Sequence, residues 1–192
     1  MGGARRWGRV AVRRASGTVR AVDITDLIMA DHQRQRLLFL LLDTADPGDT
    51  RALAAIWGSL AVSLEVHARI EEELFYPRLL AEVEGEEDDT EDAIKDHNGI
   101  REGIRAAREA AVGSPSWWDA VNHARHENDE HLGEEEGGPL PAFRRSVPAD
   151  EREQLAVRFA TLEAELTARE YAHPGTVPLG DRDPQEFVAS NS

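Results

Sequence analysis

The chain presents one pattern of histidine and acidic residues twice. Each copy has an Asp-His pair and, about 35 residues later, a histidine followed four residues on by a glutamate. The first copy consists of Asp31, His32, His67 and Glu71, and the second of Asp96, His97, His131 and Glu135. A proline lies ten residues after the last histidine of each copy, at Pro77 and Pro141. Two matched sets in one chain predict two related halves that bring their polar residues to a common site.

The spacing of the apolar residues predicts which secondary structure carries this pattern. They recur every three or four residues, and no segment shows the alternation of a half-buried strand. Helices are expected over about 23–44, 49–82, 90–112, from Ser116 to Gly138, and over 146–172. We therefore predict an all-α fold, a four-helix up-down bundle with an additional C-terminal helix. That last helix is expected to pack outside the bundle or to form part of a dimer contact, so the chain is expected to be a monomer or a homodimer.

Composition divides the chain into four parts. These are an arginine-rich arm over 1–22 that is expected to be disordered, the bundle over 23–145, the additional helix over 146–172 and an irregular tail over 173–192. Within the bundle, residues 82–92 (EVEGEEDDTED) are expected to form a solvated loop, because a block of like charges repels itself. Pro77 is expected to kink or end the second helix.

The repeated histidines and glutamates lie on the apolar stripes of the predicted helices, so they face the core. A histidine and a glutamate four residues apart share one helix face within about 6 Å, and together they offer a nitrogen and a carboxylate. The chain has no cysteine, so any metal is bound by nitrogen and oxygen, which suits iron, manganese or zinc. Four buried histidines without partners would each cost about 1–3 kcal/mol, which favours a dinuclear metal site. The candidate ligands are His32, His67, Glu71, His97, His131 and Glu135.

The fourth predicted helix offers more than one choice of ligand pair. His123 begins one further pair of this spacing, and His126 with Glu130 forms another. Five residues separate His126 from His131, about 140° around a helix, so His126 is expected on the surface. Only His131 keeps the ten-residue distance to a proline. We therefore predict His131 and Glu135 as ligands, with His126 and Glu130 as the alternative pair.

The charge of the chain excludes several classes of partner. Its 22 basic and 37 acidic residues give a net charge of −15, and without the six arginines of the arm the balance is 16 minus 37, or −21. Such an acidic body repels phosphate, so no nucleic acid partner is expected. No uninterrupted apolar run reaches the roughly 18 residues of a membrane span, and the N-terminus lacks the apolar segment of a secretory signal. We expect a cytoplasmic protein with no membrane partner.

With these residues in place, the chain resembles the hemerythrin-like family, also called the HHE cation-binding domain. The resemblance rests on the segments DLIMADHQRQR, HARIEEELFYP, IKDHNGIREGI and HLGEEEGGPLPAF, within about residues 24 to 145. It implies a four-helix bundle that holds two iron ions with an oxo or hydroxo bridge. It further implies that His32 and His67 bind one iron, that His97 and His131 bind the other, and that Glu71 and Glu135 bridge both.

One position departs from the family pattern and bears on function. Oxygen-carrying hemerythrins have a second histidine four residues after the histidine of the third helix, where this chain has Arg101. Each iron would then keep open or water-filled positions unless Tyr76, Glu102 or His123 fills one. We expect a di-iron protein that reacts with hydrogen peroxide or dioxygen, with catalase-like turnover. The alternative, which leaves enzyme activity open, is reversible binding of dioxygen or nitric oxide, or sensing of iron or oxygen, without turnover.

Overall fold

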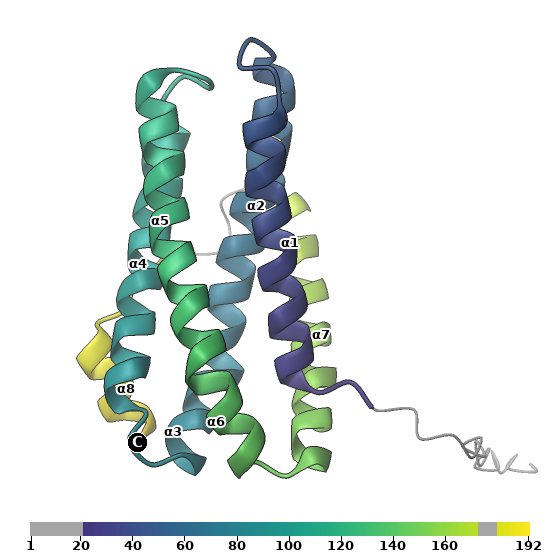
Figure 1. The fold of residues 1–192 in the computed structure, drawn as a ribbon, viewed down its shortest axis with the longest axis vertical. Coiled ribbons are helices and arrows are strands. Elements are labelled where there is room, and N and C mark those ends of the chain that lie inside the picture. Colours follow the sequence, from purple (N-terminus) through teal and green to yellow (C-terminus); the bar gives the residue numbers. More distant parts are fainter. Residues whose placement is uncertain (1–20, 173–179) are drawn as a thin grey trace, which may run out of the picture.

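The computed structural model describes residues 21–172 and 180–192, and every regular element in these ranges is helical. Four long helices lie side by side along the longest axis (Figure 1): α1 (Ile24–Thr44), α2 (Thr50–Ile70), α4 (Glu87–Glu109) and α5 (Pro115–Gly137). The turns from α1 to α2 and from α4 to α5 lie at the same end, so consecutive helices are antiparallel. The predicted all-α, up-down four-helix bundle is confirmed. The expected arm lies outside the described residues up to residue 20.

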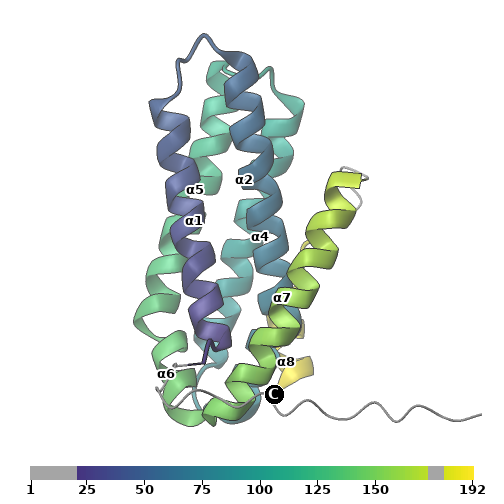
Figure 2. The same ribbon diagram turned by 90° about the vertical axis from the view of Figure 1, so that its right-hand side faces the viewer.

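The predicted additional helix is present and lies on the outside of the bundle. After α5 the chain forms a short helix that was not predicted, α6 (Pro139–Ser146), and then α7 (Ala149–Ala172), which begins three residues later than the expected 146. Figure 2 shows α7 beside α1 and α2 at one end of the bundle and leaning away from them toward the other.

The tail expected to be irregular contains a further helix, so that prediction is wrong in its last part. Residues 173–179 lie outside the described ranges, but α8 (Pro184–Asn191) follows them. Asp183 caps this helix by accepting the backbone N–H of Glu186 at 2.8 Å, and a proline in the first turn needs no hydrogen-bond partner. The segment was too short and polar for apolar periodicity to reveal it.

Two helices begin earlier than predicted. The N-cap of α5 is Ser114 and not Ser116: the Ser114 hydroxyl accepts the N–H of Trp117 at 3.2 Å, and a proline fits the first helical position. Helix α4 begins at Glu87, inside the stretch expected to be a loop. Carboxylates in a first turn interact favourably with the positive end of the helix dipole, which offsets part of their mutual repulsion.

The second predicted helix changes its hydrogen bonding where the acidic residues lie. It consists of α2, a π-helical turn η1 (Glu71–Phe75) and α3 (Tyr76–Glu82). Pro77 has no N–H, and in an α-helix its ring would clash with the carbonyl four residues earlier. The wider turn, in which the Tyr76 N–H bonds the Glu71 carbonyl, accommodates the proline. Its extra residue also brings Glu71, Glu72 and Tyr76 into the core together.

By length and composition alone, the 33-residue stretch Thr50–Glu82 is long and apolar enough to cross a membrane. In the fold, 56% of the most apolar 18-residue segment of this stretch is buried. The stretch also carries charged side chains into the centre of the bundle. Core helices of soluble proteins share these properties, so the stretch is accounted for by its central place.

The core is divided by a layer of buried polar side chains. One apolar cluster, which includes Phe39 and Trp117, lies toward the end where α1 meets α2, and another, which includes Phe75 and Phe143, lies toward the opposite end. Along the helices between them lie the buried polar residues His32, Gln35, Glu65, His67, Glu71, Glu72, His97, Arg101, Asn128, His131 and Glu135. The bundle therefore encloses a polar site between two apolar ends.

Candidate metal centre

The structure gathers five of the six predicted residues into two groups that share one carboxylate. His32, His67 and Glu71 form one group, and Glu71, His97 and His131 form the other, with the candidate ligand atoms of each group within 4.8 Å of one another. All five side chains are almost completely buried. Glu71 Oε1 lies 3.0 Å from His67 Nε2 and 4.0 Å from His32 Nε2. Glu71 Oε2 lies 3.3 Å from His97 Nε2 and 3.6 Å from His131 Nε2, so this carboxylate can bridge two cations.

The sixth residue, Glu135, adjoins the first group without joining either. Its Oε2 lies 3.2 Å from His32 Nε2, while its Oε1 accepts a hydrogen bond from the Tyr76 hydroxyl at 3.1 Å. Burial, together with the nearby Glu135 and Glu71 carboxylates, raises the pKa of Tyr76 well above its usual value. The phenol therefore stays protonated and holds one oxygen of Glu135 away from the histidines.

The remaining candidates from the sequence lie outside this site. His126 and Glu130 are 65% and 59% exposed on the outer face of α5, so the structure contradicts the alternative pair. His123 is 41% exposed and lies 3.6 Å from Glu127, and Glu102 is exposed. Of the three residues considered for an open metal position, only Tyr76 reaches the site.

A carboxylate that is not among the six predicted ligands, Glu136, lies behind His32. His32 Nδ1 lies 2.9 Å from Glu136 Oε1, and the same oxygen accepts a hydrogen bond from Arg36 Nη1 at 2.7 Å. We call Arg36, Glu136 and His32 the first hydrogen-bond chain. A carboxylate behind a histidine fixes the ring orientation and tautomer that present Nε2 to a metal.

The other half of the bundle repeats this arrangement. His97 Nδ1 lies 3.1 Å from Glu72 Oε1, which accepts a hydrogen bond from Arg101 Nη2 at 2.8 Å. We call Arg101, Glu72 and His97 the second hydrogen-bond chain. Burial opposes the ionisation of Glu72, but His97 and Arg101 lower its pKa to about 2. Arg101 is thus placed to orient His97 by way of the Glu72 carboxylate.

The sequence contains a signal for both hydrogen-bond chains. An arginine follows the first histidine of each copy by four residues, in DHQRQR and DHNGIR, and a second glutamate follows each predicted ligand glutamate. Each chain joins the two copies: the arginine and histidine come from one copy and the glutamate from the other. Spacing along one helix could not reveal a contact that the bundle forms between helices.

The charges of the site balance one another in pairs. Burial opposes the protonation of His67, but Glu71 and Asp31 raise its pKa well above the ordinary value. Burial likewise opposes the ionisation of Glu71, but the facing histidines hold its pKa well below the usual range. Burial, with the neighbouring His97, lowers the pKa of His131. Protons thus balance the buried carboxylates, and metal ions bound here would displace those protons.

The atoms that point into the centre fit a metal. Within the described residues, Nε2 of His32 and His67, both oxygens of Glu71 and Oε2 of Glu135 make no well-formed hydrogen bond, and only the ion pairs among them offset their burial. Leaving such buried atoms unsatisfied costs about 1–3 kcal/mol each. Imidazole nitrogen suits iron, copper, nickel and zinc, and carboxylate oxygen suits manganese, so the donor set fits transition metals. These residues could hold two ions, one in each group.

Replacing Tyr76 with phenylalanine is expected to destabilise the metal-free protein. The substitution keeps the buried ring but leaves a Glu135 oxygen unsatisfied, which should lower the free energy of unfolding by about 1–3 kcal/mol. Urea unfolding with a chelator present measures this change. The matched control is Tyr171→Phe, at a tyrosine that is 60% exposed, and it should leave stability unchanged. Equal midpoints for Tyr76→Phe and the parent would show that the hydroxyl does not hold Glu135.

Comparisons with known proteins agree with this geometry. Residues 23–143 match the family model described as the hemerythrin HHE cation binding domain. A Nostoc sp. protein named DNA nickase is 25% identical over 175 residues, which cover 85% of this chain and 49% of that protein. The chain therefore spans about half the length of this curated relative. The crystal structure of a hemerythrin HHE cation binding domain-containing protein from Mycobacterium kansasii covers 88% of this chain and 99% of its own, with a TM-score of 0.68 and 20% identity, and it shows the shared fold.

Proposed function

This chain belongs to the hemerythrin HHE cation-binding domain family, and from that premise we propose that it is a di-iron protein that reacts with hydrogen peroxide or dioxygen. The observation that carries the proposal is the pair of buried histidine groups that share Glu71. In this proposal, His32 and His67 would hold one iron, and His97 and His131 would hold the other. Glu71 belongs to both groups and would be shared, and Glu135, beside His32, would support the first position.

Bound iron would supply the change of oxidation state that peroxide or dioxygen chemistry requires. The protein supplies the enclosure and the orientation of the ligands. The apolar clusters at both ends of the bundle exclude bulk water, and the two hydrogen-bond chains fix His32 and His97. In catalase-like turnover, two hydrogen peroxide molecules give two water molecules and one dioxygen molecule, so no other reductant is needed.

Two buried amides support a small polar substrate. Gln35 and Asn128 are 0% and 1% exposed, and neither the oxygen nor the nitrogen of either side chain has a partner among the described residues. Gln35 lies three residues after His32 on α1, and Asn128 lies three residues before His131 on the antiparallel α5, so both lie on the same side of the histidines. Amides both donate and accept hydrogen bonds, as hydrogen peroxide does. In the proposal, these amides orient the substrate.

The double variant Gln35→Leu, Asn128→Leu tests this role. It should keep its metal and be as stable as the parent or more stable, because apolar side chains replace unsatisfied amides. Oxygen release from hydrogen peroxide should fall about 10- to 100-fold, the loss expected for one or two hydrogen bonds of about 1.4 kcal/mol each. Initial rates at equal metal content measure the effect, and unchanged rates would remove the amides from the reaction.

We propose no role on DNA, although one relative is named a DNA nickase. Outside the arginine-rich arm the chain has 16 basic and 37 acidic residues, and phosphate contacts need a basic surface. We therefore expect metal-loaded protein to leave supercoiled plasmid intact in an assay that contains Mg²⁺ or Mn²⁺ and no hydrogen peroxide. Plasmid nicking by catalytic amounts of protein, lost when Glu71 is replaced, would contradict this expectation.

Metal analysis and peroxide turnover test the proposed function together. We expect about two iron ions per chain after aerobic purification or reconstitution, and sustained oxygen release when hydrogen peroxide is added. Two irons without oxygen release, together with a reversible spectral change under dioxygen or nitric oxide after reduction, would replace the proposal with a carrier or sensor. A chain that retains no iron after reconstitution would refute both.

A further inference from the structure

The end of the chain is fastened to the half of the bundle that carries His97. We call residues 180–192 the C-terminal strap. Its helix α8 lies beside α4 and α3, as Figure 1 shows. Phe187 is only 7% exposed and packs in the apolar cluster that includes Phe75 and Phe143. The strap is therefore packed against the bundle and is not a free tail.

Two sets of polar contacts fix the beginning of the strap on α4. Arg105 donates two hydrogen bonds to the Asp181 carboxylate, at 2.8 and 3.1 Å. The side chain of Asn98 donates to the Arg182 carbonyl at 2.8 Å and accepts the Arg182 N–H at 3.0 Å. Asn98 follows His97 in the chain, so the strap is held one residue from a candidate ligand.

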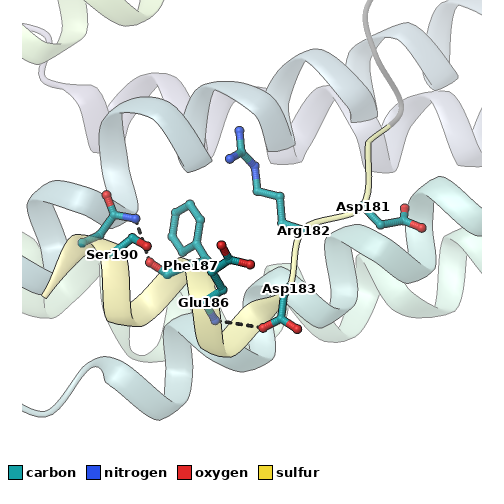
Figure 3. Close-up of a pocket in the computed structure, with 7 residues that line it drawn as sticks. Asp181, Arg182, Asp183, Glu186, Phe187 and Ser190 are labelled. Atoms are coloured by element: carbon teal, nitrogen blue, oxygen red, sulfur yellow. Dashed lines mark hydrogen bonds between the residues drawn. The ribbon is translucent and has the colours of Figure 1, made fainter.

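The side chain of Arg182 continues from this anchor into the polar layer. Figure 3 shows the residues of the strap that line a pocket of about 310 Å³. The side chains of Arg182 and Phe187 extend from the strap toward the same side, and the side chain of Asp181 points away from them. The guanidinium lies 5.7 Å from the centre of the Phe187 ring, and its Nε donates to Glu72 Oε2. The other Glu72 oxygen faces His97 and Arg101, so both oxygens of this carboxylate are occupied.

This contact makes the two hydrogen-bond chains unequal. In the second hydrogen-bond chain, the side chains of Arg101 and Glu72 are 1% and 0% exposed, and Arg182 gives Glu72 a second cationic partner. Arg101 also donates to the buried carboxylate of Glu65 at 3.0 Å. In the first hydrogen-bond chain, the side chains of Arg36 and Glu136 are 32% and 25% exposed. Among the described residues, the strap makes no polar contact with either of them. The two hydrogen-bond chains thus differ in how far they are enclosed and in the number of arginines that contact the carboxylate: two at Glu72 and one at Glu136.

We propose that the C-terminal strap, through Arg182 and Glu72, fixes His97 and thereby slows metal release from the position formed by Glu71, His97 and His131. The inference rests on the proposed metal site. Arg182 is a positioning residue that acts through Glu72 and His97. The metal position formed by His32, His67 and Glu71 has no such contact, so its ion should be released faster.

Cobalt release from single-position variants of the full chain tests the proposal. His67→Ala leaves Glu71, His97 and His131, and His131→Ala leaves His32, His67 and Glu71. In the His67→Ala background, Arg182→Gln should speed cobalt transfer to a chelator about tenfold, and Arg182→Lys should restore most of the slow rate. In the His131→Ala background, the same changes should alter the rate less than twofold. Arg36→Gln is the matched control, and it should act only in the His131→Ala background.

The outcomes separate this inference from the metal site itself. Parent protein that binds no cobalt would refute the site and the inference together. Cobalt binding with equal acceleration by Arg182→Gln in both backgrounds would assign Arg182 a general structural role, and no acceleration in either would exclude any role; both results overturn the inference alone. Melting temperatures of the metal-free variants, compared with their backgrounds, identify any loss of folding.

Discussion

Replacing Glu71 with glutamine is expected to remove both metal ions, because this residue belongs to both histidine groups. An amide has one oxygen and no charge, so it cannot bridge two cations as the carboxylate can. Outer residues of metal sites typically contribute 10- to 100-fold in affinity, so loss of a shared ligand should weaken binding at least about 100-fold. Cobalt titration of the metal-free variant, followed by metal analysis after gel filtration, measures the change.

Glu73→Gln is the matched control for this substitution. Glu73 lies in the same π-helical turn, but its side chain is 35% exposed and pairs with Arg69 on the outer face. The control variant should bind two ions with the affinity of the parent. Two ions bound to Glu71→Gln with parental affinity would show that the carboxylate of Glu71 is not a shared ligand.

Removing the metal is expected to cause a large loss of stability. Each ion present at about 1,000 times its dissociation constant stabilises the folded chain by about 4 kcal/mol, so two ions contribute about 8 kcal/mol. The structural reason is the set of buried atoms on His32, His67, Glu71 and Glu135 that make no well-formed hydrogen bond and that metal ions would coordinate. Urea unfolding of reconstituted protein, with and without a chelator, measures the difference.

The Glu71→Gln variant serves as the control for the chelator. If its binding is about 100-fold weaker, each ion at the same concentration stabilises it by only about 1.4 kcal/mol, so its unfolding midpoint should respond to the chelator no more than about a third as much as that of the parent. A parent protein whose midpoint does not respond to metal removal would show that the polar layer is satisfied in another way, and that the histidine groups do not hold ions in solution.

Much of the fold could be predicted because helical spacing is a local property. The stripe of Ile28, His32 and Phe39 faces the core as expected, and the apolar spacing of the other helices placed His67, His97 and His131 in the same layer. The end of the chain could not be predicted in this way. Helix α8 is eight residues long with one buried apolar side chain, Phe187, which is too little for periodicity to detect.

The surroundings of the site depend on contacts between distant segments. Glu72 was not predicted because consecutive residues on a helix point in directions about 100° apart, so apolar spacing assigns only one of the two glutamates to the core face. In the structure both Glu71 and Glu72 are buried in the π-helical turn. Arg182 lies 110 residues from Glu72 in the chain, and nothing in its local sequence indicates that contact. The sequence thus predicted the candidate ligands, whereas the groups that orient them emerged only from the tertiary structure.

Anomalous diffraction at the iron absorption edge, from crystals of iron-loaded protein, tests the di-iron site most directly. We predict two anomalous peaks per chain. One should lie among His32, His67 and Glu71, and the other among Glu71, His97 and His131. A single peak, or peaks at surface residues such as His126 and Glu130, would contradict a di-iron site built on a shared Glu71.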